Sequence, residues 1–161
     1  MEHRKLDSID LRLLAELQTN GRITNVELSR RAKITAPPCL RRMRALEKAG
    51  YIQGYHADID PKLLGFEVTG FAFVGLASQH DHDLKQFEER IRSWPQVREC
   101  YMLSGEVDFL LRVVAQDMSA FQRFITDTLT SEPNVASVKT ALCIHASKHE
   151  PGVPLEIREP I

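Results

Sequence analysis

Apolar residues recur at helical spacing in the first part of the chain. Ile9, Leu13 and Leu17 fall on one helical face that follows Asp7, whose side chain can cap the helix. The dipeptide Asn-Gly at residues 20–21 accepts unusual backbone angles and ends the pattern. This spacing predicts a first helix of about three turns.

Two further helices follow within a short distance. Thr24 and Glu27 have the spacing of a capping box, which predicts the start of a short second helix. Thr35 then precedes two prolines, a combination typical of a helix N-terminus, and Gly50 ends the third helix. Only a tight turn fits between the second helix and the third.

The third helix carries an unmixed basic face. A short helix, a tight turn and a helix with exposed arginines are typical of a helix-turn-helix that binds DNA. A charged helix face is often no more than a solvated face, but its position after a capped short helix favours DNA, and the positive end of this helix can also accept a phosphate. The predicted DNA-binding residues are Thr24, Asn25, Thr35, Pro37, Pro38, Arg41, Arg42, Arg44 and Lys48. Residues 51–59 are predicted to form a strand or wing, and residues 61–65 a linker.

The second half of the chain has the order βαββαβ. The predicted elements are strands at 68–77, 97–103, 107–115 and 135–145, a helix at 81–93 and a helix that follows Asp117. A shift of 38 positions aligns Pro95 with Pro133 and Val97 with Val135, so the two halves are repeats. An α+β chain is therefore predicted, with a helix-turn-helix domain at 1–60 and a ferredoxin-like domain at 66–148.

Two helices on one face of a four-stranded sheet leave the other face bare. The predicted strands are apolar on both faces, so a monomer would expose a large apolar patch, and self-association is expected. A two-fold dimer suits DNA recognition, since paired helices then match half-sites about 34 Å apart.

The distribution of charge also differs between the two predicted domains. Residues 1–64 hold 12 basic and 8 acidic side chains, while residues 65–161 hold 9 and 14, although the whole chain has a net charge of −1. The three cysteines lack disulfide or zinc spacing, which fits a reducing cytoplasm. No apolar run is long enough to span a bilayer. Residues 80–83 (His-Asp-His-Asp) fit a solvated helix start better than a metal site, and no catalytic arrangement is found, so neither metal nor cofactor is expected.

Several short motifs occur in an order typical of one family. They are LDSID at 6–10, GRITNVEL at 21–28, PCLRR at 38–42, GYIQGY at 50–55 and SGEVDF at 104–109. Residues 6–148 resemble the Lrp/AsnC, or feast/famine, transcriptional regulators, and most of all their leucine-responsive branch. The resemblance implies a bacterial, cytoplasmic, nucleoid-associated protein that forms dimers and often octamers, binds pseudo-palindromic DNA, and responds to an amino-acid effector such as leucine.

The resemblance also implies effector residues. These are Met102, Ser104, Gly105, Asp108, Met118, Thr140, Ala141 and Leu142. Backbone amides at Ser104 and Gly105 would hold the ligand carboxylate, and Asp108 its ammonium. Ala141 departs from the larger aromatic residue of leucine-responsive members. The alternatives are that the turn at Gly105 is an ordinary hairpin turn and that Met102 and Met118 only pack in the core or an interface.

One alternative function remains open at this point. Some proteins that resemble the family are sirohaem decarboxylases on the same fold, but the basic third helix favours the regulator. The tail at 149–161 is expected to be extended, with no function assigned to it.

Overall fold

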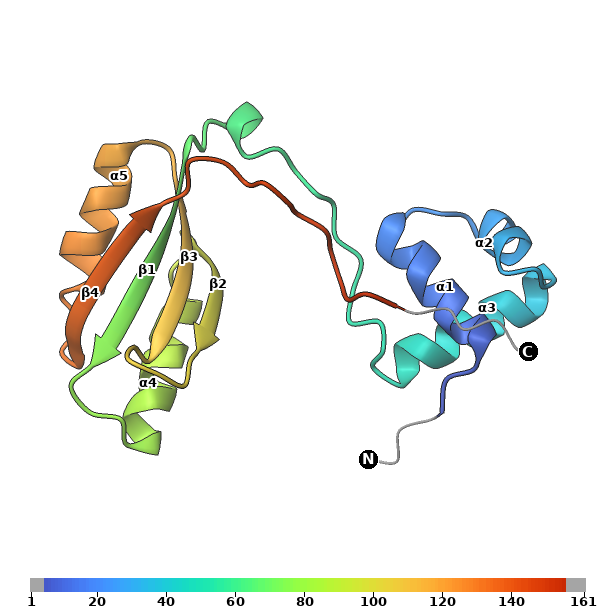
Figure 1. Cartoon of the computed structure of the whole chain (residues 1–161), viewed down its shortest axis with the longest axis horizontal. Helices are drawn as coiled ribbons and strands as arrows, with labels where there is room; N and C mark the ends of the chain where they lie inside the picture. The colour runs from blue at the N-terminus through green and yellow to red at the C-terminus, as the bar shows by residue number, and fades with distance from the viewer. Residues whose placement is uncertain (1–4, 156–161) are drawn as a thin grey trace. The chain divides into compact units, whose positions relative to one another are not determined.

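The computed structural model describes residues 5–155 and divides into two units. The first unit contains residues up to 58 together with the tail from 148, and the second contains residues 59–147. Figure 1 shows helices in the first unit and a sheet with helices in the second.

The first unit is built on α1 (Ser8–Thr19), α2 (Asn25–Arg31) and α3 (Ala36–Lys48). They enclose a small apolar core that consists of Leu13, Leu28, Ala32, Cys39 and Leu46. Two of the predicted caps are present, since Asp7 Oδ1 accepts from Asp10 N at 2.8 Å and Thr24 Oγ1 accepts from Glu27 N at 3.2 Å. The reciprocal half of the capping box is replaced, because the Glu27 carboxylate accepts from Arg30 and Arg31.

The start of α3 lacks the side-chain cap that Thr35 was expected to supply. Thr35 occupies the N-cap position, but its hydroxyl makes no cap hydrogen bond. The amides that a cap would accept from belong to Pro37 and Pro38, and proline has no N–H. The two prolines that favour the helix start therefore also remove its cap.

Residues 51–59, predicted to form a strand or wing, form no strand. These residues are extended but belong to no ladder, and a strand requires a partner for its backbone groups. The segment is attached to α3 through side chains instead, since Tyr55 Oη donates to Glu47 Oε1 at 3.0 Å. Burial together with this hydrogen bond raises the pKa of Tyr55 to about 12.

An ion pair joins α1 to α3. Arg42 Nη1 donates to Asp10 Oδ1 at 2.8 Å and to Asp7 Oδ2 at 2.7 Å. The Asp10 side chain is 1% exposed and that of Arg42 is 25% exposed. Burial raises the pKa of the Asp7 carboxyl, but hydrogen bonds from Asp10 N and Arg42 outweigh burial and lower it.

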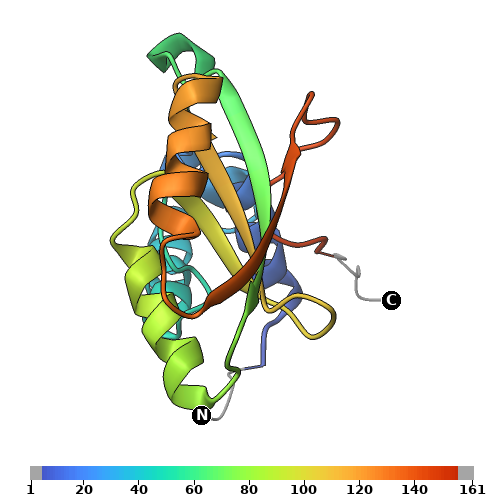
Figure 2. The ribbon, with the colours of Figure 1, turned by 90° about the vertical axis from the view of Figure 1, so that its left-hand side faces the viewer.

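The second unit is the predicted ferredoxin-like fold. Its strands are β1 (Val68–Leu76), β2 (Val97–Met102), β3 (Phe109–Ala115) and β4 (Val135–Leu142), in the antiparallel order β2-β3-β1-β4. The helices α4 (Asp81–Arg92) and α5 (Met118–Arg123) cover one face of this sheet, as Figure 2 shows. A short 3-10 turn, Lys62–Leu64, precedes β1.

The helix that follows Asp117 is not α-helical throughout. After α5 it widens into a π-helix over Phe124–Leu129, in which Thr130 N donates to Ile125 O at 2.9 Å. Residues five positions apart then approach one face, and both Phe124 and Leu129 are buried. Close packing continues at Gly70, where an added Cβ would lie 2.5 Å from the Phe121 ring.

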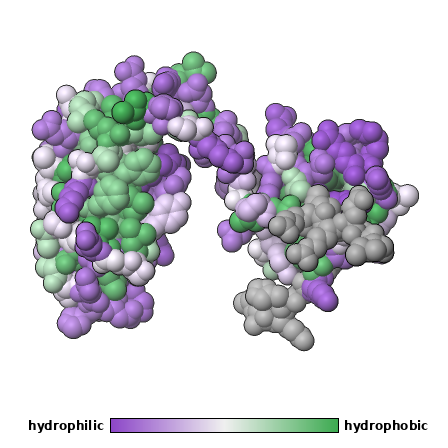
Figure 3. Space-filling model, in the orientation of Figure 1, coloured by the Kyte–Doolittle hydropathy of each residue, from purple (hydrophilic) through white to green (hydrophobic). Residues whose placement is uncertain are grey.

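The opposite face of the sheet is uncovered in the single chain. Its half-buried or exposed residues alternate with the buried ones, and include Phe71, Phe73, Tyr101, Leu110 and Val114. The ion pair of Arg112 Nε with Glu99 Oε1, at 2.8 Å, crosses the same face. Figure 3 shows hydrophobic residues gathered over the strands of this unit.

The described part of the tail contacts α1. Gln18 Nε2 donates to Val153 O at 3.0 Å, and Val153 N donates to Gln18 Oε1 at 2.9 Å. Gly152 has a φ of 78°, and a Cβ there would overlap the Gln18 side chain. The described part of the tail is thus held by a side chain of the same chain, and residues 156–161 of the predicted tail lie outside the described residues.

The Arg42 ion pair predicts a difference between two neighbouring arginines. Arg42→Ala removes a guanidinium that hydrogen-bonds to the buried Asp10 carboxylate, and we expect the free energy of unfolding to fall by about 3 kcal/mol. Urea denaturation measures this. Arg41→Ala is the matched control and should change stability by no more than about 0.5 kcal/mol. Equal stability of the two variants would contradict this role of Arg42.

Candidate functional site

A basic stripe runs along the exposed side of α3. We define it as Pro37, Arg41, Arg44 and Lys48, which follow each other at intervals of four, three and four residues and are all exposed. This spacing places them on one helical face. The stripe holds three of the four basic residues that the sequence predicted on this helix.

Arg42 lies outside the stripe. Its guanidinium is directed to the α1 carboxylates, and hydrogen bonds to Asp10 and Asp7 raise its pKa. Arg42 directly follows Arg41, and consecutive residues of a helix are rotated by about 100° about its axis, so the two side chains point in different directions. In this arrangement Arg42 orients α3, and the stripe presents charge to solvent.

Thr24 and Asn25 lie at the start of α2. Thr24 is exposed and caps this helix, while Asn25 Nδ2 donates to Ala36 O at 3.0 Å and so ties α2 to the first residue of α3. The Asn25 Oδ1 atom is buried and has no hydrogen-bond partner among the described residues. Asn25 thus fixes the position of α3 relative to α2, and Thr24 stabilises the start of α2.

The N-terminus of α3 offers few amides to an anion. Pro37 and Pro38 have no N–H, and Cys39 N donates to Thr35 O at 3.2 Å. Ala36 contributes the one remaining amide in this first turn. An incoming phosphate at this end would therefore depend on side-chain cations more than on the helix amides.

The turn between α2 and α3 contains Lys33, which the sequence reasoning did not select. Lys33 has a φ of 56°, in the left-handed region, and is exposed. A tight turn after a helix needs a residue with positive φ, and residues 32–34 contain no glycine. That requirement is the signal by which the sequence could have singled out Lys33.

The other basic residues near the turn are paired within the chain. Glu27 accepts from Arg30 and Arg31, and Arg31 also donates to Glu16 Oε2 at 2.9 Å. These arginine contacts lower the pKa of Glu27 to about 2. Between residues 25 and 48, the lysine and arginine side chains that remain without a carboxylate partner among residues 5–155 are those of the stripe and Lys33.

Asp108, a predicted effector residue, supports the turn between β2 and β3. Its Oδ2 accepts from Leu76 N at 2.6 Å, its amide donates to Val74 O at 2.9 Å, and Leu103 N donates to its carbonyl at 2.8 Å. One carboxylate oxygen thus continues the hydrogen bonds of β1 beyond the end of the ladder. The structure gives the other oxygen no protein partner within residues 5–155.

Ser104 and Gly105 form the exposed tip of the same turn. The φ of Gly105 is outside the left-handed region, and a Cβ at this residue would meet nothing within 4 Å. The fold therefore does not require glycine here.

The remaining effector candidates lie elsewhere in the unit. Met102 pairs with Phe109 and belongs with the turn, whereas Leu142 pairs with Gly70 near the opposite end of β1. Three strand spacings, about 14 Å, separate β2 from β4. The structure thus divides the candidates into a turn group (Met102, Ser104, Gly105 and Asp108) and a β4 group (Thr140, Ala141 and Leu142).

The β4 group is itself divided between the two faces. Thr140 and Leu142 pair with Ala72 and Gly70, which face the helices, whereas Ala141 pairs with Phe71 on the uncovered face. Met118, the first residue of α5, is 48% exposed and lies at the same end of the sheet as Leu142. A single amino acid cannot touch both groups within one chain.

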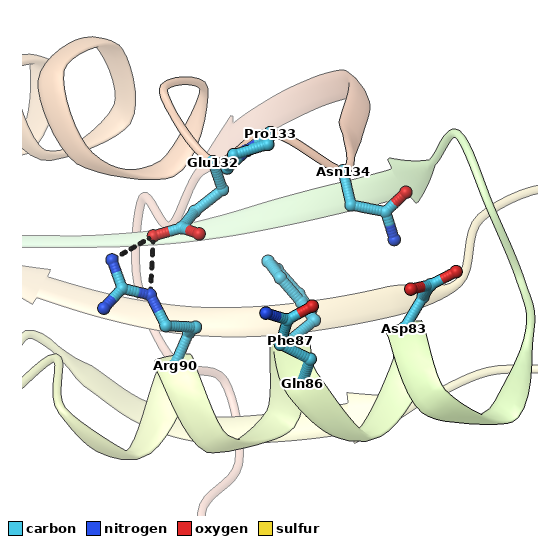
Figure 4. Close-up of a pocket in the computed structure, with 7 residues that line it drawn as sticks. All are labelled: Asp83, Gln86, Phe87, Arg90, Glu132, Pro133 and Asn134. Atoms are coloured by element: carbon cyan, nitrogen blue, oxygen red, sulfur yellow. Dashed lines mark hydrogen bonds and ion pairs between the residues drawn. The ribbon is translucent and has the colours of Figure 1, made fainter.

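A groove lies between α4 and the loop that precedes β4, with a volume of about 370 Å³ (Figure 4). Several of its charged and amide groups have partners: Arg90 Nη2 donates to Glu132 Oε1 at 2.8 Å, and Asn134 exchanges two hydrogen bonds with the Ser78 backbone. The Ser78 hydroxyl and the neighbouring His82 lower the pKa of Asp83. No predicted effector residue lines this groove.

The described residues contain neither a metal-binding cluster nor a membrane-spanning helix. Within 5–155, no group of three His, Cys, Asp or Glu side chains is arranged to hold a metal ion. The cysteines at 39, 100 and 143 are free. Over the same range, no helix combines the length and apolar character needed to cross a membrane.

Comparison with known protein families assigns both units. Residues 6–53 match the winged helix-turn-helix DNA-binding family, and residues 69–153 match the Lrp/AsnC ligand binding domain. The first match contains α1 to α3 with the basic stripe, and the second contains the sheet except its first residue, Val68, together with the turn group.

Individual relatives agree with these matches. The leucine-responsive regulatory protein of Rhizobium meliloti (strain 1021) is 51% identical over 144 residues, which cover 89% of this chain and 92% of the relative. The Bkd operon transcriptional regulator of Pseudomonas aeruginosa is 40% identical over 151 residues, which cover 94% of this chain and 99% of the relative. These relatives are named as transcriptional regulators and not as enzymes, which decides against the decarboxylase alternative.

Solved structures show the same fold. A transcriptional regulator from Neisseria meningitidis, in complex with L-Met, has a TM-score of 0.89 and 37% identity, with 94% of this chain and 97% of that chain covered. An AsnC family regulator from Agrobacterium tumefaciens has a TM-score of 0.86 and 31% identity, with 93% and 97% covered. The chain therefore belongs to the Lrp/AsnC family and is a DNA-binding transcriptional regulator with an amino-acid ligand-binding domain.

Proposed function

We propose that the chain binds pseudo-palindromic DNA as a homo-oligomer, with the stripe of each α3 in the major groove, and that a small amino acid modulates this binding. The observation that carries the proposal is the stripe itself, in which three basic side chains share one exposed face of α3. Arginine can bind phosphate or the O6 and N7 atoms of guanine, so this face suits a duplex. Residues 1–60 would act as the DNA-binding domain and residues 66–148 as the effector domain, in the cytoplasm of a bacterium.

The turn group is the proposed ligand site. Asp108 has a carboxylate oxygen to offer an ammonium, and the exposed backbone at Ser104 and Gly105 can approach a carboxylate. The relatives include a leucine-responsive protein and a regulator bound to L-Met, so the probes of first choice are these two amino acids. Leucine-responsive members have a large aromatic residue at the position of Ala141. Because this alanine is small, it favours a different effector from theirs.

A second copy of the chain is the proposed cover of the bare sheet face. Phe71, Phe73 and Leu110 are half-buried in the single chain and form part of an apolar face, and a two-fold partner would bury this face on both chains at once. Association would also bring a turn group close to groups of another protomer, which a single chain cannot do. Effector binding would then favour one assembly over another and change the spacing of the paired α3 helices.

The DNA surface is tested by removing stripe charges. We expect Arg41→Ala combined with Arg44→Ala to lower the affinity for a DNA fragment selected with the wild-type protein. The slope of log K against log salt should decrease by about 2, since each lost phosphate contact accounts for about 1. Fluorescence anisotropy over about 0.05–0.2 M salt measures both quantities.

The control removes the same charge elsewhere. Arg92 and Arg98 are exposed in the second unit, so Arg92→Ala combined with Arg98→Ala should leave affinity and slope unchanged. If the stripe variant binds as tightly as this control, the stripe does not bind DNA.

The ligand site is tested by a change that keeps the fold. Asp108→Asn retains an oxygen that accepts from Leu76 N but removes the charge that would attract an ammonium. With L-Met or L-Leu at about 100 times Kd, the wild type should be stabilised by about 2.7 kcal/mol and the variant by much less. Thermal-shift titration measures the difference.

Two further variants in the same turn complete the test. Glu106→Gln removes a neighbouring charge and should titrate like the wild type. Gly105→Ala has room for its methyl group and should keep its Tm without ligand, but it should bind the amino acid less tightly because the backbone is less accessible. An unchanged titration of Asp108→Asn would place the ligand elsewhere.

A further inference from the structure

Lys33 has a backbone conformation that L side chains avoid. Its φ is 56°, and it is the one non-glycine residue within 5–155 that has a positive φ. Gly50, Gly65 and Gly152 are the other residues with positive φ, at 78–79°. In the left-handed region a Cβ approaches the following carbonyl oxygen, so any residue except glycine is strained there.

The two helix ends that flank α3 allow a direct comparison. At the end of α2, Lys33 N donates to Arg30 O and Ile34 N to Ser29 O. At the end of α3, Gly50 N and Tyr51 N donate in the same pattern, to Glu47 O and Leu46 O. Both ends are Schellman motifs, which need a left-handed residue and favour glycine. The backbone therefore explains the φ of residue 33 but not the lysine.

The side chain of Lys33 does nothing for the fold. Lys33 is exposed, and its ammonium has no ion pair or hydrogen bond within the described part of the chain. The neighbouring Arg30 and Arg31, by contrast, are bound to Glu27. A strained residue whose side chain serves no internal contact points to a role outside the chain.

The position of Lys33 indicates what that role is. It lies three residues before Ala36, at the N-terminal end of the stripe, where the helix start has lost amides to Pro37 and Pro38. A phosphate that meets this end finds the positive helix dipole but few N–H donors. A lysine at the turn supplies the missing positive charge.

We propose that the Lys33 ammonium binds a backbone phosphate of the DNA at the N-terminal end of the stripe. The inference rests on the proposed function and adds one contact to it. Since an ammonium is a point charge without the bidentate geometry of arginine, this contact holds the duplex in register and reads no base. The strain at residue 33 is retained because glycine cannot make the contact.

Lys33→Gly separates the backbone role of the residue from the role of its side chain. This variant should melt at a Tm at least as high as the wild type, because the strain is gone. It should bind DNA about 3- to 10-fold more weakly at about 0.1 M salt, with a salt slope smaller by about 1. The loss should be the same on the selected fragment and on a scrambled one.

Two other variants make the result decisive. Lys33→Arg keeps the charge and should restore affinity, and Lys62→Gln, at an exposed lysine of the second unit, should bind like the wild type. Wild-type affinity and salt slope in Lys33→Gly would overturn the inference, as would a loss confined to the selected fragment. If the Arg41 and Arg44 double variant also bound normally, the proposed function itself would fail, so the two failures are distinguishable.

Discussion

The rotation of α3 about its own axis decides what this protein offers to DNA, and a buried carboxylate fixes that rotation. Asp10 is 1% exposed and holds Arg42 at 2.8 Å, so the Arg42 side of the helix faces α1. Helical geometry then turns Arg41, Arg44 and Lys48 outward. Because removal of a buried charge partner is costly, alternative rotations of the helix are disfavoured. The ion pair thus orients the stripe for DNA binding without itself being part of the stripe.

A second constraint belongs to the sheet. Four strands with both helices on one face bury Phe109, Leu111 and Val113, but leave Phe71, Phe73 and Leu110 without cover in a single chain. The same arrangement places β2, which leads into the turn group, about 14 Å from β4. Both features are resolved together if a second chain covers the sheet. Assembly, ligand binding and DNA spacing would then depend on one interface.

Most of the fold follows from short-range signals in the sequence. Periodicity, caps and the repeat predicted α1 to α3 and the four-stranded sheet, since these depend on neighbours within one turn or one strand pair. What the sequence does not indicate has longer-range causes. Residues 51–59 have an extended pattern but no ladder partner, and local spacing does not indicate that Arg42 binds Asp10, 32 positions away. The pattern of basic residues does not indicate backbone conformation and so does not select Lys33. The division of the effector candidates into two groups depends on the order of the strands in the sheet.

The central claim is that an amino acid bound to one unit changes the DNA affinity of the other. It is tested most directly by measuring the Kd for the selected DNA with and without saturating L-Met or L-Leu, and the Kd for the amino acid with and without DNA. Linkage requires the two ratios to be equal, and the account predicts a common factor of about 5 to 150. A ratio of one in both titrations, with both ligands bound, would contradict it.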